Sequence, residues 1–254
     1  MIKVSVNGKE RKLPSNWRDI GLSQYDKVME VADNQIKLIS VITGLSESEV
    51  SRLSVESANL LTAILKFLET PFKLNEYENP REVNINGLTI NPLFDIKEKS
   101  LYQKMQLQTL LEEKDFNIDK NISTILELYL QPLCTSKKYS TLETEHVKKL
   151  IYESIGIVDA HLLAAYYIGQ LGEILETEKN TLDRKPTGEQ RRAGIERFNK
   201  YGMFNIVDAL AKGDVLKWEQ VLELDYNTVY LKLLKEKDES IFQEAYTKIM
   251  QPKK

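Results

Sequence analysis

Two histidines and a single cysteine are the first residues in this 254-residue chain that could carry chemistry. His146 and His161 lie on separate predicted helices and lack the His-Glu-x-x-His spacing of a zinc protease. Asp159 precedes His161 by two positions, and residues two apart on a helix point to different faces. Cys134 has no accompanying His or Asn motif of a cysteine nucleophile. We therefore predict packing roles for His161 and Cys134, and no catalytic or metal-binding residue.

Composition narrows the function classes further. The glycines form neither a P-loop nor a dinucleotide-binding fingerprint, so we expect no cofactor. A net charge of −3, with charges of both signs interspersed, argues against a dedicated nucleic-acid binder. One cysteine excludes an intrachain disulfide and fits a reducing compartment. No signal peptide is recognised, and the longest apolar stretch, Leu162–Ile168, is too short to span a membrane.

One basic cluster invites a functional interpretation. Its members are interleaved with Asp183, Glu189 and Glu196. They are Arg184, Lys185, Arg191, Arg192, Arg197 and Lys200. We rank a solvated helix face with local ion pairs first, a protein partner second and nucleic acid third.

Two Asn-Gly pairs punctuate an otherwise helical sequence. Asn7-Gly8 and Asn86-Gly87 are each flanked by alternating apolar residues, and both residue types tolerate the positive φ of a type I′ turn. Each pair therefore predicts a β-hairpin. Because an isolated two-stranded hairpin is marginally stable, we expect the two hairpins to share one sheet.

Helical periodicity and capping signals organise the rest of the first 95 residues. Apolar residues at intervals of three and four predict one helix that begins at Ser23 and ends at Gly44. Ser46 and Glu49 form a capping box that starts a short helix. A third helix is predicted at 56–69. Trp17 and Tyr25 are predicted core residues that anchor the sheet on the first helix.

The sequence from Lys97 onward predicts only helices. Helices are predicted at 97–113, 120–130, 141–154 and 158–176, with Pro132 and a Ser140/Glu143 capping box separating the second from the third. The last of these is apolar almost all round at 162–171, as a central helix would be. Its Gly169 and Gly172 would allow another helix to approach closely.

A polar stretch with Pro186 and Gly188 is predicted to be a hinge before a C-terminal helical segment. Gly213 would end one helix there and Asp214 would cap the next, which carries Trp218. A final amphipathic helix aligns four residues on one face. They are Phe242, Ala245, Tyr246 and Ile249.

Together these elements predict an α+β fold that is mostly α-helical, with a small antiparallel sheet from the two hairpins, a helical bundle and a C-terminal helical segment. The predicted divisions are an α+β unit at 1–95, a bundle packed on it at 96–177, the hinge at 178–188 and the C-terminal segment at 189–254.

Three stretches resemble a known family. Pro14–Tyr25 is similar to the opening of tail and baseplate-hub assembly proteins of tailed bacteriophages, including contractile-tailed and crAss-like phages. Leu126–Pro132 with Lys138–Ser140, and Arg192–Asn205 running into Leu210–Asp214, resemble later segments of such proteins. Each stretch is a packing pattern rather than a chemical signature.

The resemblance implies a non-enzymatic structural subunit of a phage tail, neck or baseplate hub. Its copies would meet head to tail in rings and bind neighbouring virion proteins, in the host cytoplasm during assembly and in the virion afterwards. The alternative is a soluble tail-assembly chaperone absent from the finished virion, and a remote one is an enzyme with an unrecognised site. Arginine and aromatic residues are enriched at interfaces. The predicted interface residues are Arg191, Arg192, Phe198, Tyr201 and Trp218.

Overall fold

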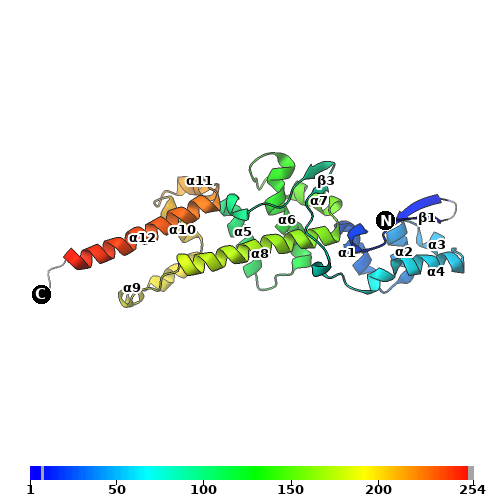
Figure 1. Ribbon diagram of the computed structural model, residues 1–254, viewed down its shortest axis with the longest axis horizontal. Coiled ribbons are helices and arrows are strands. Elements are labelled where there is room, and N and C mark those ends of the chain that lie inside the picture. The colour runs from blue at the N-terminus through cyan, green and yellow to red at the C-terminus, as the bar shows by residue number, and fades with distance from the viewer. Residues whose placement is uncertain (7–8, 251–254) are drawn as a thin grey trace. The chain divides into compact units, whose positions relative to one another are not determined.

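The computed structural model describes residues 1–6 and 9–250 and is 67% helical, with two small antiparallel sheets, which confirms the predicted mostly helical α+β class (Figure 1). The chain forms two compact units. Unit 1 combines residues 1–94 with 117–166, and unit 2 combines residues 95–116 with the chain from Tyr167 onward. The four consecutive segments set out above remain a prediction. None of the helices in the described residues is long and apolar enough to cross a membrane.

Unit 1 holds both hairpins and most of the helices that precede the long helix α8. Its strands are β1 (Ile2–Val6), β2 (Lys9–Leu13), β3 (Val83–Ile85) and β4 (Leu88–Ile90). Its helices are α1 (Leu22–Glu30), α2 (Gln35–Thr43), α3 (Glu47–Val50), α4 (Val55–Ile64), α6 (Ile118–Thr135), α7 (Thr144–Ser154) and the first part of α8 (Ile157–Thr181). Short 3₁₀ turns are η1 (Trp17–Asp19), η2 (Leu65–Glu69) and η3 (Leu74–Glu76).

The prediction that both hairpins share a sheet is wrong. β1 pairs only with β2, and β3 only with β4, among the described strands. Each hairpin instead packs on helices: β2 contacts α2, β3 contacts α7, and β4 contacts α6. The second turn has the predicted geometry, since Asn86 and Gly87 have φ of 51° and 84°. The first predicted turn, Asn7-Gly8, lies outside the described residues.

The helix predicted between Ser23 and Gly44 is two helices. α1 ends at Glu30, and Asn34 starts α2 by accepting a hydrogen bond from the Lys37 backbone N–H at 3.1 Å. The apolar periodicity continues across the break, which is why the sequence read as one helix. Gly44 ends α2 with φ of 67°, and Ser46 and Glu49 form the predicted capping box.

The core of unit 1 contains an aromatic cluster around the buried Trp17. Its ring lies 5.5 Å from Phe67 and from Phe72 and 5.9 Å from Tyr25, which is half-buried. The indole N–H donates to the Thr70 carbonyl at 2.8 Å. This confirms Trp17 as a core residue and places Tyr25 at the edge of the core.

The backbone that follows η1 lies close to the backbone at the start of α8. Gly21 and Gly156 form a backbone bridge, flanked by hydrogen bonds of 2.8 Å from Leu22 to Ile155 and from Ile157 to Ile20. A Cβ at Gly156 would stand 3.3 Å from the Arg18 carbonyl oxygen. This glycine, rather than Gly169 or Gly172, is where the backbone needs room, because a Cβ at either of those meets nothing within 4 Å among the described atoms.

Pro132 does not separate two helices. It lies inside α6, whose buried residues run from Ile122 to Gln131, and this packing outweighs the loss of one backbone donor. The predicted Ser140/Glu143 capping box is also wrong. α7 begins at Thr144, after Glu143, without a side-chain cap, because the Ser140 backbone is held by the buried Gln131 side chain.

Unit 2 combines α5 with the second part of α8 and the C-terminal helices. Its elements are η4 (Ile96–Glu98), α5 (Leu101–Glu112), α9 (Gly188–Arg192), η5 (Ile195–Tyr201), α10 (Phe204–Leu210), η6 (Val215–Lys217), α11 (Trp218–Leu222) and α12 (Tyr226–Met250). Gly213, the predicted end of a helix, has a positive φ of 76°. Asp214 caps η6 and not the helix that carries Trp218, because α11 begins at Trp218, after Lys217, without a side-chain cap. A bridge between Ser100 and Asp225 joins the beginnings of α5 and α12.

Candidate protein-binding surface

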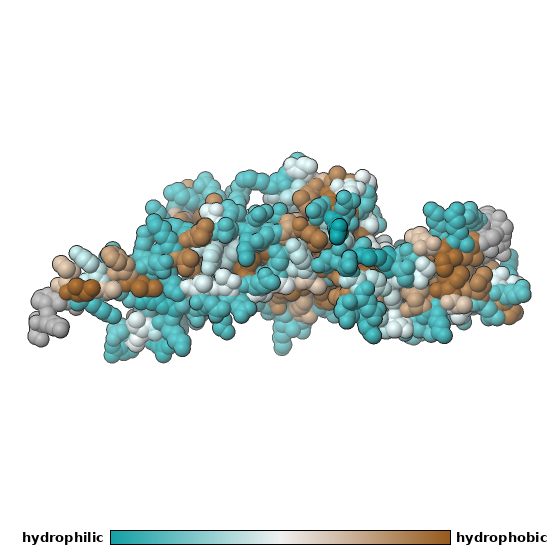
Figure 2. Space-filling model, viewed as in Figure 1, coloured by the Kyte–Doolittle hydropathy of each residue, from teal (hydrophilic) through white to brown (hydrophobic). Residues whose placement is uncertain are grey.

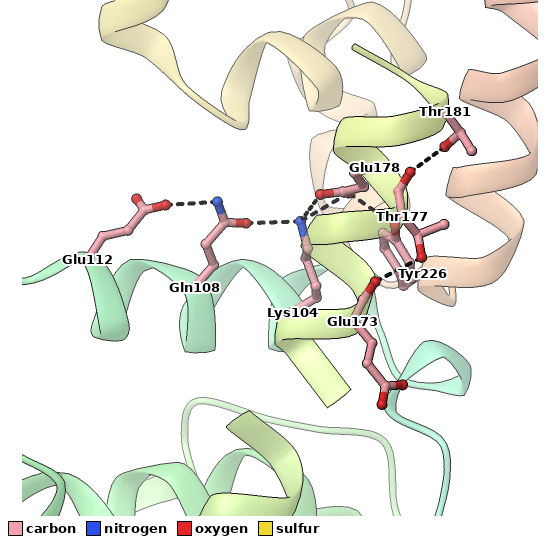
Figure 3. A network of polar contacts seen from close by, with 8 residues as sticks. All are labelled: Lys104, Gln108, Glu112, Glu173, Thr177, Glu178, Thr181 and Tyr226. Carbon is pink, nitrogen blue, oxygen red and sulfur yellow. Dashed lines mark hydrogen bonds and ion pairs between the residues drawn. The ribbon is translucent and has the colours of Figure 1, made fainter. Parts of the chain in front are cut away.

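A buried charge network fixes the start of α12 in unit 2 (Figure 3). Lys104 on α5 is 1% exposed, and its ammonium donates to both carboxylate oxygens of Glu178 on α8 at 3.0 and 3.1 Å. It also donates to Gln108 at 2.9 Å. Tyr226, the first residue of α12, donates its hydroxyl to Glu178 at 3.0 Å and places its ring 5.5 Å from the ammonium. Three helices therefore meet at one satisfied ion pair.

Burial, with the adjacent Glu178 carboxylate, raises the pKa of the Tyr226 hydroxyl far above its ordinary value. The hydroxyl therefore remains a protonated donor at any physiological pH. Because Lys104 and Tyr226 both donate to Glu178, the network holds α12 against α5 and α8 without an unpaired buried charge.

A second set of polar contacts continues along one face of α12. Lys237 donates to the Thr181 carbonyl at 2.5 Å, and Arg184 donates to the Ser240 hydroxyl at 3.3 Å and forms an ion pair with Glu244. The hydrogen bond from Arg184 lowers the pKa of Glu244. Lys237, Ser240 and Glu244 are spaced i, i+3 and i+7 and share one helix face. The predicted hinge thus contacts α12 through its first residues.

The opposite face of α12 is apolar and uncovered. We name Phe242, Ala245, Tyr246 and Ile249 the α12 stripe; it is the set predicted to lie on one face. Phe242, Tyr246 and Ile249 are 60%, 50% and 79% exposed, and the two aromatic rings stack 5.9 Å apart. Figure 1 shows no other helix beside the red last turns of α12, and brown side chains lie along them in Figure 2. Contiguous exposed apolar residues of this kind mark interaction sites.

The five predicted interface residues lie on three other elements of unit 2. Arg191 and Arg192 are exposed on α9. Phe198 and Tyr201 are 54% and 51% exposed on η5. Trp218, on α11, is half-buried.

Ring contacts among the described residues do not join Trp218 to the other aromatic members of this predicted set. Among the described residues, Trp218 has Phe204 as its ring partner, 6.0 Å away, rather than Phe198 or Tyr201. The exposed members of the set are available to a partner, whereas Trp218 packs partly within its own unit. Their role as an interface remains a prediction.

The histidines and the cysteine are placed as follows. His161 is buried, with Nδ1 2.9 Å from the Ile157 carbonyl oxygen and Nε2 2.8 Å from Asp119. Asp159, two residues before His161 in the sequence, forms an ion pair with Arg18 at 3.0 Å. Cys134 is half-buried, and burial raises its pKa to about 11, so the thiol stays protonated at neutral pH. His146 is exposed. No group of three or more potential metal ligands occurs in the described part of the chain.

Sequence reasoning missed the Lys104–Glu178 pair and the Asp119–His161 contact. A lysine on a helix ordinarily faces water, and its partner here is 74 residues away. The α12 stripe was found because its periodicity is local, but the pattern alone did not say whether the protomer covers it.

The chain matches no protein-family model, and no curated protein or solved structure matches it either.

Proposed function

We propose that this chain is a non-enzymatic structural subunit of a bacteriophage tail, neck or baseplate hub, present in several copies that bind one another and neighbouring tail proteins. The observation that carries the protein-binding part is the uncovered α12 stripe, held by polar contacts on the opposite helix face. The phage assignment rests on the resemblance of Pro14–Tyr25, Leu126–Pro132 and Arg192–Asn205 to such proteins.

The arrangement suits protein binding because the stripe is presented in a defined orientation. A free amphipathic helix would have to become ordered before it could bind, whereas Arg184 and Lys237 already hold α12 in place. An apolar helix face with anchors at i, i+4 and i+7 is a common way to occupy a groove on another protein.

A second candidate is a tail-assembly chaperone that is absent from the mature virion. The small size of the α12 stripe favours it, since a contact over two helical turns falls below the area of a stable interface and suits transient binding.

Mass spectrometry of purified particles separates these functions. A structural subunit is expected in finished particles at several copies for each tail. A chaperone is expected in the infected-cell lysate only. Replacing the native chain with Phe242→Glu tests the stripe in either role, with Leu142→Glu as control because Leu142 is 95% exposed on a different unit. If Phe242→Glu assembles tails as well as the control does, the stripe is not the binding surface.

A further inference from the structure

The exposed apolar residues of α12 belong to a longer pattern that runs along most of the helix. From Thr228 onward its positions are spaced alternately three and four residues apart, which is the spacing of the a and d positions of a coiled coil. We name these positions the α12 seam. They are Thr228, Leu231, Lys235, Asp238, Phe242, Ala245 and Ile249.

Every residue of the α12 seam is exposed. Leu231, near the start of the helix, is 56% exposed, which is close to the 60% of Phe242. The buried residues of α12, Tyr226 and Val229, lie about half a helical turn away from the seam. The unit therefore covers one face of α12 and leaves the seam uncovered over about 32 Å, at a rise of about 1.5 Å for each residue.

Two residues in the middle of the seam carry opposite charges. Lys235 forms an ion pair with Glu239 one turn later at 3.1 Å, and both side chains are exposed, so this pair contributes little. Asp238 is exposed on the next turn. An apolar groove laid over the seam would remove both charges from water without giving either a partner, which is unfavourable. The seam therefore favours an occupant that offers an acidic group to Lys235 and a basic group to Asp238.

A second copy of α12 that runs in the opposite direction is such an occupant. In an antiparallel helix pair, each a position faces a d position of the other helix. When the pair is centred midway between Lys235 and Asp238, Lys235 faces the partner's Asp238 and Asp238 faces the partner's Lys235. In the same arrangement Leu231 and Phe242 face each other. Opposite charges and apolar side chains are thus matched at once, and the two-fold symmetry makes each match twice.

Other arrangements of two α12 helices lack this match. A parallel pair in register places Lys235 against Lys235 and Asp238 against Asp238, so like charges meet in the seam. An antiparallel pair shifted by one heptad places either Asp238 against Phe242 or Lys235 against Leu231. The charges therefore select both the direction and the register of the pair.

The positions beside the seam agree with the same register. On one side Leu234 faces Ile241 of the other helix, and Ile241 is 44% exposed. On the other side Lys232 faces Glu239. The second contact lies at the solvent-exposed rim, so it supports the register and adds little strength.

We propose that α12 of one copy pairs antiparallel with α12 of a second copy through the α12 seam, with Lys235 of each copy facing Asp238 of the other. This inference rests on the proposed multi-copy function and deepens it by naming a surface through which two copies meet. The interface is isologous, because both copies use the same surface, and it is complete with two copies. The α12 seam by itself therefore yields a dimer and nothing larger.

The charged centre of the seam sets the strength of this contact. Polar residues at a and d positions specify the register of a helix pair at a cost in stability. Only one helix from each copy takes part, so the interface is smaller than those of permanent dimers. The dimer should accordingly be weak, and its population should rise with protein concentration.

Charge exchange in the full-length chain tests the pairing. Sedimentation velocity should show a concentration-dependent monomer–dimer equilibrium for the native chain and for the Leu142→Glu control. Lys235→Glu and Asp238→Lys should each weaken dimerisation at least tenfold, because each places like charges together at two symmetric contacts. An equimolar mixture of these two variants should dimerise as the native chain does, since every seam contact then joins opposite charges. Circular dichroism checks that α12 stays helical in each variant.

Cysteine cross-linking tests the antiparallel direction independently. In the proposed register Thr228 faces the partner's Ala245, whereas two Ala245 residues lie about 25 Å apart along the helix axis. In a Cys134→Ser background, an oxidised mixture of Thr228→Cys and Ala245→Cys should give a disulfide-linked dimer that contains one chain of each kind. Ala245→Cys alone should give none.

Several results would overturn the proposal. A native chain that stays monomeric up to the highest soluble concentration refutes it, and so does a mixture of the two charge variants that dimerises no better than either alone. A cross-link formed by Ala245→Cys alone would mean that the helices pair in another direction or register. A chain that dimerises as proposed but is missing from finished particles refutes the proposed structural function alone, whereas a chain found in particles that stays monomeric when purified refutes this inference alone.

Discussion

Replacing Lys104 with Met is expected to destabilise unit 2 selectively. The substitution fits the volume of the site, since Met is unbranched and adaptable, but it removes the ammonium that pairs with Glu178. Breaking a buried pair by removing one partner costs about 3–5 kcal/mol, because a buried charge is left uncompensated. The Glu178 side chain is 18% exposed and keeps its hydrogen bond from Tyr226, so water and that hydroxyl relieve part of the penalty. We therefore expect a loss of about 3 kcal/mol.

A double variant of Lys104 and Glu178 distinguishes the effect of the unpaired Glu178 charge from the effect of altered packing at Lys104. Adding Glu178→Gln removes the unpaired charge while its amide oxygen still accepts from Tyr226, so stability should return to within about 1 kcal/mol of the native chain. Lys232→Met is the matched control, because Lys232 is an exposed lysine on α12 that pairs with Glu236 across one turn, and its loss should leave stability unchanged.

Hydrogen exchange of α5 and α12 amides is the appropriate assay, since a chain with two compact units need not unfold in one transition. The expected result is faster exchange in these helices for Lys104→Met and native-like exchange for the double variant. If Lys104→Met costs less than about 1 kcal/mol, or the double variant is no better than the single one, the pair does not hold α12.

Three further predictions concern unit 1. Trp17→Ala should cost roughly 3–5 kcal/mol in urea denaturation, because it empties the centre of the aromatic cluster; an unchanged midpoint would mean that the residue is not a core anchor. Burial raises the pKa of Glu127, so the folded state holds its proton more tightly than the unfolded chain, and native stability should fall as pH rises above the ordinary value of 4.5. Glu127→Gln should lack this decline when unfolding free energies at about pH 4 and about pH 7 are compared, and parallel declines in both proteins would contradict the assignment. Gly156→Ala should cost roughly 1–2 kcal/mol by thermal melting, since its Cβ would press on the Arg18 carbonyl, whereas Gly172→Ala should cost nothing comparable.

Features governed by neighbouring residues could be predicted from the sequence. The Asn86-Gly87 turn, the Ser46/Glu49 capping box and the Gly44 helix end depend on side chains within a few positions of one another. Their geometry is fixed by φ preferences and local hydrogen bonds, so tertiary packing has little opportunity to change them.

Features that depend on contacts between residues far apart in the sequence could not be predicted from it. Pro132 is a helix breaker in isolation, but the packing of the buried α6 residues that precede it, from Ile122 to Gln131, keeps the helix intact. The two hairpins failed to share a sheet because helices supplied the apolar surface that another strand pair would have covered. For the candidate surface, periodicity identified the α12 stripe, whereas the buried Lys104 that anchors the same helix had no local signal.

The interleaving of the two units has a consequence for synthesis on the ribosome. α5 emerges early, yet its partner α12 begins at Tyr226, more than one hundred residues later, which is a delay on the order of ten seconds at ordinary translation rates. Throughout that interval Leu101 and Leu107, both fully buried in the finished fold, lack the helix that covers part of unit 2. All residues of unit 1 have emerged once residue 166 leaves the ribosome, so unit 1 can fold then. Nascent chains therefore pass through a state in which unit 1 is folded and unit 2 is not. Such chains are open to capture by cellular chaperones, and removing residues 189–254 would make that state permanent.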